Sequence, residues 1–462
     1  MFNLPIGSFV YLIGIGGVGM TPLALYLHQM GYVVAGSDIQ SFRMADALQK
    51  AGIQVFTSHQ ADQVSHAQLV IYSTAIPEGN PEYKEATRLN IPCIDRLEAV
   101  SHLVSGKKLL SVTGSYGKST TTTFSAYFAK LAGLTPSYLI GADLLTFPPA
   151  HWNRNQSDWF VFETDESRPE FLQYFPYGCI LTNIGTDHLL NYQQDILRLQ
   201  DHLYQYLLKT NQEGCIVVSQ DAFQRLSLFS SRFPCRVLVC GTEASCQYRY
   251  EIVNLQFQQD HFETTFHLSV PGKRYQNLVL RMPGEKYVLD AVLAYALITE
   301  ISGSTIDPDS FRSLPILDRR SQLKRVWKTS LLIDDEGDSP EVIKEVLLNV
   351  RNLFPDCTIL PIVQPHRFSR LQSLLISYAE VLAAYADEII LMPVYSAGEK
   401  PIRGIDSSSL AKQIMLQGFT GVLTLVQTPE EAAEIIVKRR QENMVFILLG
   451  PGDVWQVEHA LP

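Results

Sequence analysis

The sequence has few basic residues for its length. Its 462 residues include 37 Lys and Arg against 47 Asp and Glu, so its formal net charge is −10. A chain of this balance lacks the broad basic surface of a nucleic-acid-binding protein. It can still bind anionic ligands, but only in local sites made of backbone amides and a few cations. We therefore expect small-molecule substrates and no nucleic-acid partner.

The sequence also lacks paired cysteines and long apolar stretches. Its seven cysteines are irregularly spaced and form no C-x-x-C pair, which argues against a disulfide framework and a structural zinc site. No uncharged apolar run reaches the roughly 18 residues that a membrane-spanning helix needs. The N-terminus has no cationic segment of a signal peptide and leads directly into a glycine motif. These absences predict a cytoplasmic protein with no membrane insertion.

What the sequence does contain is three successive segments in which short β-rich runs alternate with helical ones. Such alternation is typical of α/β folds with parallel sheets. A polar break at 105–108 and a second break near 316–318 divide the chain into predicted domains of residues 1–106, 107–318 and 319–462. Within the second domain, residues 247–282 alternate apolar and polar positions, which predicts antiparallel strands.

A glycine motif, Gly14-x-Gly16-x-x-Gly19, connects the first predicted strand to the first predicted helix. Glycines allow the backbone to approach a diphosphate, and the helix N-terminus supplies amide donors and the positive end of a dipole. Asp38 follows at the end of the next predicted strand, as in a dinucleotide-binding fingerprint. The motif favours a nucleotide ligand over a tight turn without one, and it leaves NAD and other diphosphates open.

A second glycine loop, TGSYGKST at residues 113–120, also lies between a predicted strand and a predicted helix. It differs from G-x-x-x-x-G-K-[ST] because its two glycines are only three residues apart. Its backbone amides would hold phosphates, Lys118 would reach the β and γ oxygens, and the Ser119 hydroxyl would meet Mg²⁺. This loop favours ATP chemistry over the hydride transfer of an NAD-dependent oxidoreductase.

Three more polar segments follow predicted strands. Glu163 is the last residue of one of these predicted strands, where a Mg²⁺-binding acid is expected. The alternative role, an acid in a solvated turn, fits Asp165 better than Glu163. His188 in TNIGTDH is either a metal ligand or a turn histidine. In QPHRFSR at 364–370, Arg367 and Arg370 can face one phosphate or carboxylate, or can simply start a surface helix.

Taken in chain order, these motifs resemble those of the Mur ligase family. GIGGVGM followed by GSD is similar to the family's UDP-sugar-binding start, STAIPEGNPE to its S-S-A-I-x-x-x-N-P-E stretch, and TGSYGKSTTT to its ATP loop. ETDES and TNIGTDH are similar to E-A-D-E-S and T-N-I-x-x-D-H. QPHRFSR and VYSAGEKPIRGID resemble the alanine-adding branch. The resemblance covers nearly the whole chain.

The resemblance implies a UDP-binding Rossmann-like domain, a central P-loop ATPase domain and a C-terminal Rossmann-like domain. It implies that ATP and Mg²⁺ drive the condensation of L-alanine with the lactyl carboxylate of UDP-N-acetylmuramate through an acyl phosphate, in peptidoglycan precursor synthesis. An alternative is a Mur-like protein that binds the UDP-sugar or ATP with little or no turnover.

The resemblance also implies roles for individual residues. The UDP-sugar is held by the first glycine motif and the following strand end: Gly14, Gly16, Gly17, Gly19, Met20, Ser37 and Asp38. ATP is held by Gly114, Ser115, Tyr116, Gly117, Lys118, Ser119 and Thr120. Ser119 and Glu163 bind one Mg²⁺ and His188 a second, while His366 and Arg367 lie near the reacting groups.

The sequence departs from the family pattern in four places, one of which is Leu190, where the family has the acid that follows D-H. The ATP loop has Tyr116 where the family has His. The family's base-binding G-x-H-N-x-x-N reads GEKYVLD at 284–290, which introduces Lys286, Tyr287 and Asp290. Its D-D-Y-G-H-H-P reads DDEGDSP at 334–340, which introduces Glu336, Asp338 and Ser339.

Overall fold

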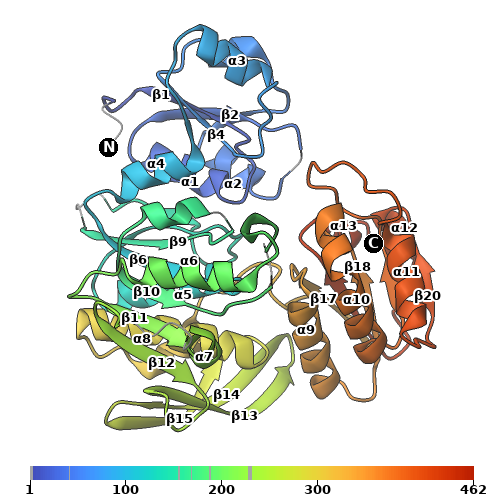
Figure 1. Cartoon of the computed structure of the whole chain (residues 1–462). Coiled ribbons are helices and arrows are strands. Elements are labelled where there is room, and N and C mark those ends of the chain that lie inside the picture. Colours follow the sequence, from blue (N-terminus) through green and yellow to red (C-terminus); the bar gives the residue numbers. More distant parts are fainter. Residues whose placement is uncertain (1–3, 41, 154–156, 168, 187–188, 227–231) are drawn as a thin grey trace. The chain divides into compact units, whose positions relative to one another are not determined.

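The computed structural model describes residues 4–40, 42–153, 157–167, 169–186, 189–226 and 232–462, and its chain forms two compact units. One unit consists of residues 1–253, 265–280 and 285–316, and the other of residues 254–264, 281–284 and 317–462. Three sheets of five, ten and six strands follow one another along the chain (Figure 1). Helices pack against these sheets, so the architecture is α/β with three domains, as the sequence predicts.

The N-terminal sheet has the strand order β3-β2-β1-β4-β5, and every neighbouring pair is parallel. Its strands are β1 (Phe9–Ile13), β2 (Val33–Ser37), β3 (Gln54–Phe56), β4 (Leu69–Tyr72) and β5 (Cys93–Asp95). Its helices are α1 (Met20–Gln29), α2 (Ala45–Lys50), η1 (Ala61–Val64), α3 (Pro81–Arg88) and α4 (Arg96–Val104).

Alternating residues of β1 bury their side chains on opposite faces of this sheet. Val10 and Leu12 join the cluster formed with α1 and α4, whereas Tyr11 and Ile13 join a smaller cluster that includes Ala86 of α3. Successive side chains of a strand point to opposite faces, so a strand covered by helices on both sides is apolar throughout. The helices accordingly lie on both faces of the sheet (Figure 1).

The central sheet has the order β15-β14-β13-β12-β11-β10-β6-β9-β7-β8. Its strands are β6 (Lys108–Thr113), β7 (Ser137–Leu139), β8 (Ala150–His151), β9 (Trp159–Glu163), β10 (Pro176–Leu181), β11 (Cys215–Ser219), β12 (Arg236–Gly241), β13 (Tyr248–Gln258), β14 (His261–Val270) and β15 (Lys273–Leu280). The helices of this segment are α5 (Lys118–Leu131), η2 (Pro169–Gln173), η3 (Leu189–Tyr192), α6 (Ile196–Leu207), α7 (Gln220–Leu226), α8 (Glu285–Ser302) and η4 (Pro308–Ser313). Two residues join β13 to β14 and β14 to β15, which is a hairpin connection between antiparallel strands.

The C-terminal sheet has the order β16-β17-β21-β18-β19-β20. Only the edge strand β16 pairs antiparallel with its neighbour. The strands are β16 (Gln322–Val326), β17 (Ser330–Asp335), β18 (Thr358–Val363), β19 (Ile389–Leu391), β20 (Leu423–Leu425) and β21 (Met444–Leu449). The helices are α9 (Pro340–Leu353), α10 (Phe368–Tyr385), α11 (Ser407–Leu416), α12 (Pro429–Arg439) and α13 (Gln456–His459). In the part of the chain that is described, no helix is both long and apolar enough to cross a membrane.

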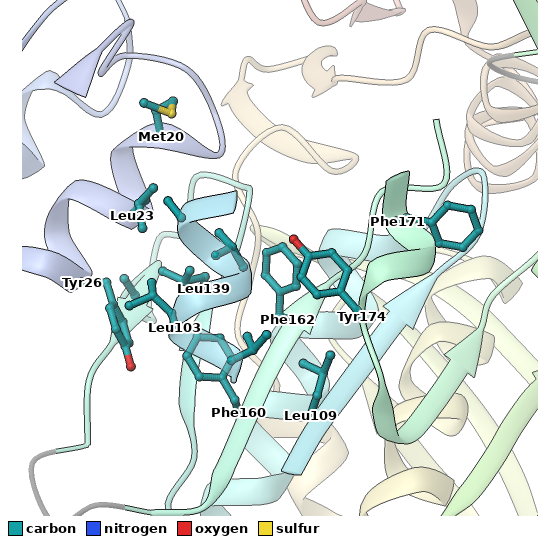
Figure 2. Packing of buried hydrophobic residues seen from close by; sticks show 14 of the residues in the cluster. Met20, Leu23, Tyr26, Leu103, Leu109, Leu139, Phe160, Phe162, Phe171 and Tyr174 are labelled. Atoms are coloured by element: carbon teal, nitrogen blue, oxygen red, sulfur yellow. The ribbon is translucent and has the colours of Figure 1, made fainter. Parts of the chain in front are cut away.

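One hydrophobic cluster joins the N-terminal sheet's helices to the central sheet. It contains side chains of α1 and α4 together with those of β6, β7, β9 and α6. Figure 2 shows Met20, Leu23 and Tyr26 of α1 in the same group of buried side chains as Leu139 and Phe160 of the central sheet. The rings of Tyr26 and Phe160 lie 5.7 Å apart between centroids. These two domains therefore share one core.

Phe160→Ala should destabilise the unit that contains this core, because Phe160 is fully buried and packs against Tyr26. We expect a loss of roughly 3–5 kcal/mol, which is typical of truncating a buried phenylalanine. Urea unfolding followed by tryptophan fluorescence measures the shift. The control is Phe175→Ala at a ring that is 69% exposed, which should cost under about 1 kcal/mol. Equal shifts for the two variants would contradict the shared core.

Candidate active site

The loop at residues 113–120 is fixed by the segment that follows β10. The Tyr116 N–H donates to Asn183 Oδ1 at 3.0 Å, and the Tyr116 carbonyl accepts from Asn183 Nδ2 and Thr182 Oγ1, each at 2.7 Å. The Gly185 N–H donates to Ser115 Oγ at 2.8 Å. The TNIG segment therefore holds the phosphate loop in shape. His188 itself lies outside the described residues.

Two glycines give this loop a path that other residues would obstruct. Gly114 has a φ of +128°, and a Cβ there would lie 2.2 Å from Thr182 Oγ1. Gly117 has a φ of +82° and precedes α5, which has no acidic residue in its first turn. The positive end of the α5 dipole and its amide groups thus face an open loop, which suits an anionic phosphate. The loop geometry fits the ATP that the sequence predicts.

Lys118, the first residue of α5, forms a buried ion pair with Glu166. Its Nζ lies 2.9 Å from Glu166 Oε2 and 3.2 Å from Oε1, and it also donates to the Gly114 carbonyl at 2.7 Å. The Glu166 side chain is fully buried. A nucleotide phosphate bound at this loop would therefore compete with Glu166 for Lys118.

The protonation of this pair is set by burial and by the surrounding carboxylates. Burial raises the pKa of Glu166 to about 7, although Lys118 opposes that shift. Burial lowers the pKa of Lys118, but the charges of Glu166, Asp165 and Glu163 outweigh it and leave the lysine pKa raised. Lys118 is consequently cationic at neutral pH, whereas Glu166 titrates near it.

Ser119 and Glu163 come together beside the loop. Ser119 Oγ donates to Glu163 Oε2 at 2.7 Å, so a hydroxyl and a carboxylate oxygen lie within reach of one cation. Mg²⁺ prefers such hard oxygen donors and usually takes only one or two of them from the protein. No cluster of three or more His, Cys, Asp or Glu side chains suitable for a metal occurs among the residues described. The Ser119–Glu163 pair therefore fits Mg²⁺ that also binds phosphate and water.

The first glycine motif forms the turn between β1 and α1, with Gly14 at a φ of +78°. The Asp38 carboxylate binds the backbone of this turn. Its Oδ2 accepts from the Gly16 N–H and its Oδ1 from the Gln40 N–H, both at 3.0 Å. A Cβ at Gly16 would lie 2.3 Å from the Phe42 ring, so only glycine fits between Phe42 and the loop. Gly17 and Gly19 complete the turn into α1.

Two of the predicted UDP-sugar residues contribute no side chain to this turn. Ser37 is on the α3 face of the sheet, where its hydroxyl donates to Glu82 Oε2 at 2.6 Å. Its backbone carbonyl is the part that reaches the loop, accepting from the Gly14 N–H at 2.8 Å. Met20 is buried in the core shared with the central domain (Figure 2). Both residues are buried and support the turn from the protein interior.

The two glycine loops lie close to each other within one unit. A Cβ at Gly141 would lie 2.0 Å from Glu163 Oε1 and 3.8 Å from Val18 Cγ1. Val18 belongs to the first glycine loop and Glu163 to the candidate Mg²⁺ pair. A ligand extending from the first loop can therefore reach the groups around Lys118 over a short distance.

In the other unit, His366 and Arg370 converge on Asp338. His366 Nδ1 lies 3.2 Å and Arg370 Nη1 2.7 Å from Asp338 Oδ2. The His366 ring also stacks on Tyr395 with centroids 5.9 Å apart. The neighbouring Ser339 caps α9, accepting from the Val342 N–H at 3.3 Å. Asp338 and Ser339, which depart from the family pattern, thus have an ion-pairing role and a helix-capping role.

Arg367 has an unusual backbone conformation. Its φ is +62°, a region that costs a non-glycine residue energy and that occurs often at functional sites. The conformation is held by the Arg367 N–H, which donates to the Tyr395 carbonyl at 2.8 Å. The exposed Arg367 directly precedes α10. Although burial opposes the shift, its guanidinium lies close enough to Glu399 to help lower the pKa of that carboxyl.

Comparison with known proteins accounts for this combination of loops. Residues 9–108 match the catalytic domain of the Mur ligase family, and residues 112–298 match the Mur ligase middle domain. A UDP-N-acetylmuramate–L-alanine ligase of Coxiella burnetii is 31% identical, with 98% of this chain and 97% of the relative covered. The chain belongs to the Mur ligase family.

Other relatives extend the similarity. A protein of the same name from Pelobacter propionicus is 30% identical over 98% of this chain and 97% of its own. The crystal structure of the UDP-N-acetylmuramate–alanine ligase of Thermotoga maritima has a TM-score of 0.80 and 26% identity, covering 97% of each chain. A murein peptide ligase of Psychrobacter arcticus, at 18% identity and a TM-score of 0.73 over 98% of each chain, shares the fold.

Sequence reasoning missed Glu166 and Asn183 as functional residues of this Mur ligase. Both lie in motifs that had been noticed, ETDES and TNIGTDH, but spacing alone does not show that one pairs with Lys118 and the other clamps Tyr116. Sequence reasoning also predicted no contact for Asp290, which is buried in α8. Asp290 lies beside the loop at residues 113–120, because a Cβ at Gly117 would lie 2.6 Å from its Oδ1. Tyr287 is likewise buried in α8, and Lys286 lies over its ring. The altered base-binding stretch therefore starts the helix that supports the ATP loop.

Glu166→Gln should tighten ATP binding about tenfold at pH 8, because an amide cannot hold Lys118 as an ion pair and the lysine no longer has to be released. In the wild type, protonation of Glu166 through its pKa of about 7 has the same effect. The ratio of wild-type to variant Kd should therefore approach one as the pH falls from 8 to 6. Titration calorimetry at both pH values measures it.

The matched control for this test is Asp165→Asn, which makes the same charge change on the exposed neighbour. It should alter the ATP Kd much less. If Glu166→Gln left ATP binding unchanged or weakened it, Glu166 would not compete with phosphate for Lys118.

Proposed function

We propose that this chain is an ATP-dependent ligase that joins L-alanine to the lactyl carboxylate of UDP-N-acetylmuramate in peptidoglycan precursor synthesis. The observation that carries the proposal is the meeting of Lys118, Ser119 and Glu163 at one loop, in a chain whose full-length relatives bear the name of that ligase. Because ATP and nucleotide sugars are made in the cytoplasm, we propose that the enzyme acts there.

We assign the substrates to the three domains that the sequence predicts, residues 1–106, 107–318 and 319–462. The UDP-sugar binds at the turn of Gly14–Gly19 with Asp38, and ATP at Gly114–Thr120. Mg²⁺ is held by Ser119 and Glu163, with His188 at a second ion. The amino acid binds near His366 and Arg367. Val18 and Glu163 both lie close to Gly141. Their proximity supports the transfer of a group from ATP to the UDP-sugar.

The proposed chemistry follows from the groups gathered at the loop. A carboxylate is a poor electrophile, so transfer of the γ-phosphoryl group to the lactyl carboxylate gives an acyl phosphate that an amine can attack, with phosphate leaving. We assign to Lys118, once it is released from Glu166, the neutralisation of charge that develops on the transferring oxygens. Mg²⁺, when bound at Ser119 and Glu163, would neutralise further phosphate charge.

A second candidate is a Mur-like protein that binds these ligands with little turnover. The observation that favours it is the pairing of Asp338 with His366 and Arg370, because the carboxylate engages two side chains of the alanine-branch motif. Phosphate release decides between the two. The ligase releases phosphate only when ATP, UDP-N-acetylmuramate and an amino acid are all present. A panel of alanine, glycine and serine gives the amino-acid preference.

Lys118→Ala should lower the rate of phosphate release about a hundredfold or more, because a charge-assisted contact to the transition state is lost. UDP-N-acetylmuramate should bind with an unchanged Kd, since its proposed site is in another domain. Lys130→Ala, at an exposed residue of the same helix, is the control and should keep full activity. Undiminished phosphate release by Lys118→Ala would remove the loop from the mechanism.

A further inference from the structure

We propose that Arg96, a residue that none of the sequence motifs includes, binds the diphosphate of the UDP-sugar. This inference rests on the proposed function, because it concerns the same nucleotide-sugar site. Arg96 is the first residue of α4, far along the chain from the glycine motif. The fold nevertheless brings its guanidinium directly onto Gly19, the last glycine of that motif.

The contact between Arg96 and Gly19 is close. A Cβ at Gly19 would lie 2.7 Å from Arg96 Nη1, 3.0 Å from Cζ and 3.1 Å from Nε. The φ of Gly19 is −92°, which any residue can adopt, so the backbone conformation does not require glycine here. The guanidinium instead occupies the space that a side chain at this position would take, so a larger residue would displace it. The third glycine of the motif thus makes room for a cation.

The surroundings of Arg96 leave its positive charge without an ion-pair partner among the described residues. The guanidinium lies at the N-terminus of α1, and its own backbone starts α4, so two positive helix ends surround it. Helix α1 has no acidic residue in its first turn. The Asp95 carboxylate next to Arg96 accepts from the Glu98 N–H as the cap of α4. Within the described part of the chain, no hydrogen bond or ion pair engages the half-buried Arg96 side chain.

Backbone donors point to the same ligand. Among the described residues, the N–H groups of Val18 and Gly19 have no hydrogen-bond partner. Val18 is 54% exposed, so this part of the loop is open to solution. Two amide donors, a helix N-terminus and a guanidinium therefore meet at one accessible point. This set matches the charge and the several acceptor oxygens of a diphosphate, and a guanidinium can bind two phosphate oxygens at once.

The test compares ligands that differ only in phosphate content. Calorimetry measures the Kd of UDP-N-acetylmuramate, UDP, UMP and uridine for the wild type and for Arg96→Gln and Arg96→Lys. Arg96→Gln should weaken UDP and UDP-N-acetylmuramate binding 10- to 100-fold, UMP less, and uridine not at all. Arg96→Lys should recover part of the loss because it keeps the charge but not the paired donors. In steady-state assays, the UDP-N-acetylmuramate KM should rise while kcat stays within about threefold.

Two controls separate a binding role from a structural one. The ATP Kd should be the same in every variant, which reports that the protein is folded. Arg88→Gln, at an exposed arginine paired with Glu85 at the end of α3, should leave every ligand unaffected. An unchanged UDP Kd in Arg96→Gln, or an equal loss for uridine and UDP, would overturn the assignment of Arg96. A wild type that binds no UDP-sugar would instead overturn the proposed function itself, and the assignment with it.

Discussion

The parallel pairing of β6 with β9 on one side and β10 on the other is the constraint on which the candidate active site depends. In this register Val112 lies opposite Glu163, and Thr113 lies opposite Leu181. Parallel neighbours end at the same edge of a sheet, so the phosphate loop, the ETDES segment and the TNIG segment all leave it at one place. The Lys118–Glu166 ion pair, the Ser119–Glu163 contact and the clamp on Tyr116 follow from that coincidence.

Much of this could be predicted from the sequence, because the signals are local. Glycines between a strand and a helix, a lysine and serine at the helix start and an acid at a strand end mark Gly114, Lys118, Ser119 and Glu163 without any knowledge of the fold. The place of Ser37 could also have been found. It is two residues after Ala35, so the period of a strand puts both on the α3 face, away from the glycine loop.

The contacts that sequence reasoning could not reach join segments that are distant along the chain. Glu166 lies 48 residues after Lys118, and Arg370 lies 32 residues after Asp338. Nothing in the spacing of either pair shows that the side chains meet, because their separation depends on how strands and helices pack. Asp338 illustrates the difference: in the sequence it breaks a family motif, whereas in the fold it contacts His366 and forms an ion pair with Arg370. The partners of charged residues are thus the feature that is hardest to predict from this sequence.

The core that α1 and α4 share with the central sheet has a consequence for synthesis on the ribosome. Domains generally fold as they emerge, N-terminal first. The first sheet and its helices are complete by Val104, but the Met20, Leu23, Tyr26 and Leu103 side chains are covered only after β6, β7, β9 and α6 have been made. About a hundred further residues must therefore be translated while this apolar face is open to water. We therefore expect the N-terminal domain, when produced alone, to leave this apolar face exposed to water.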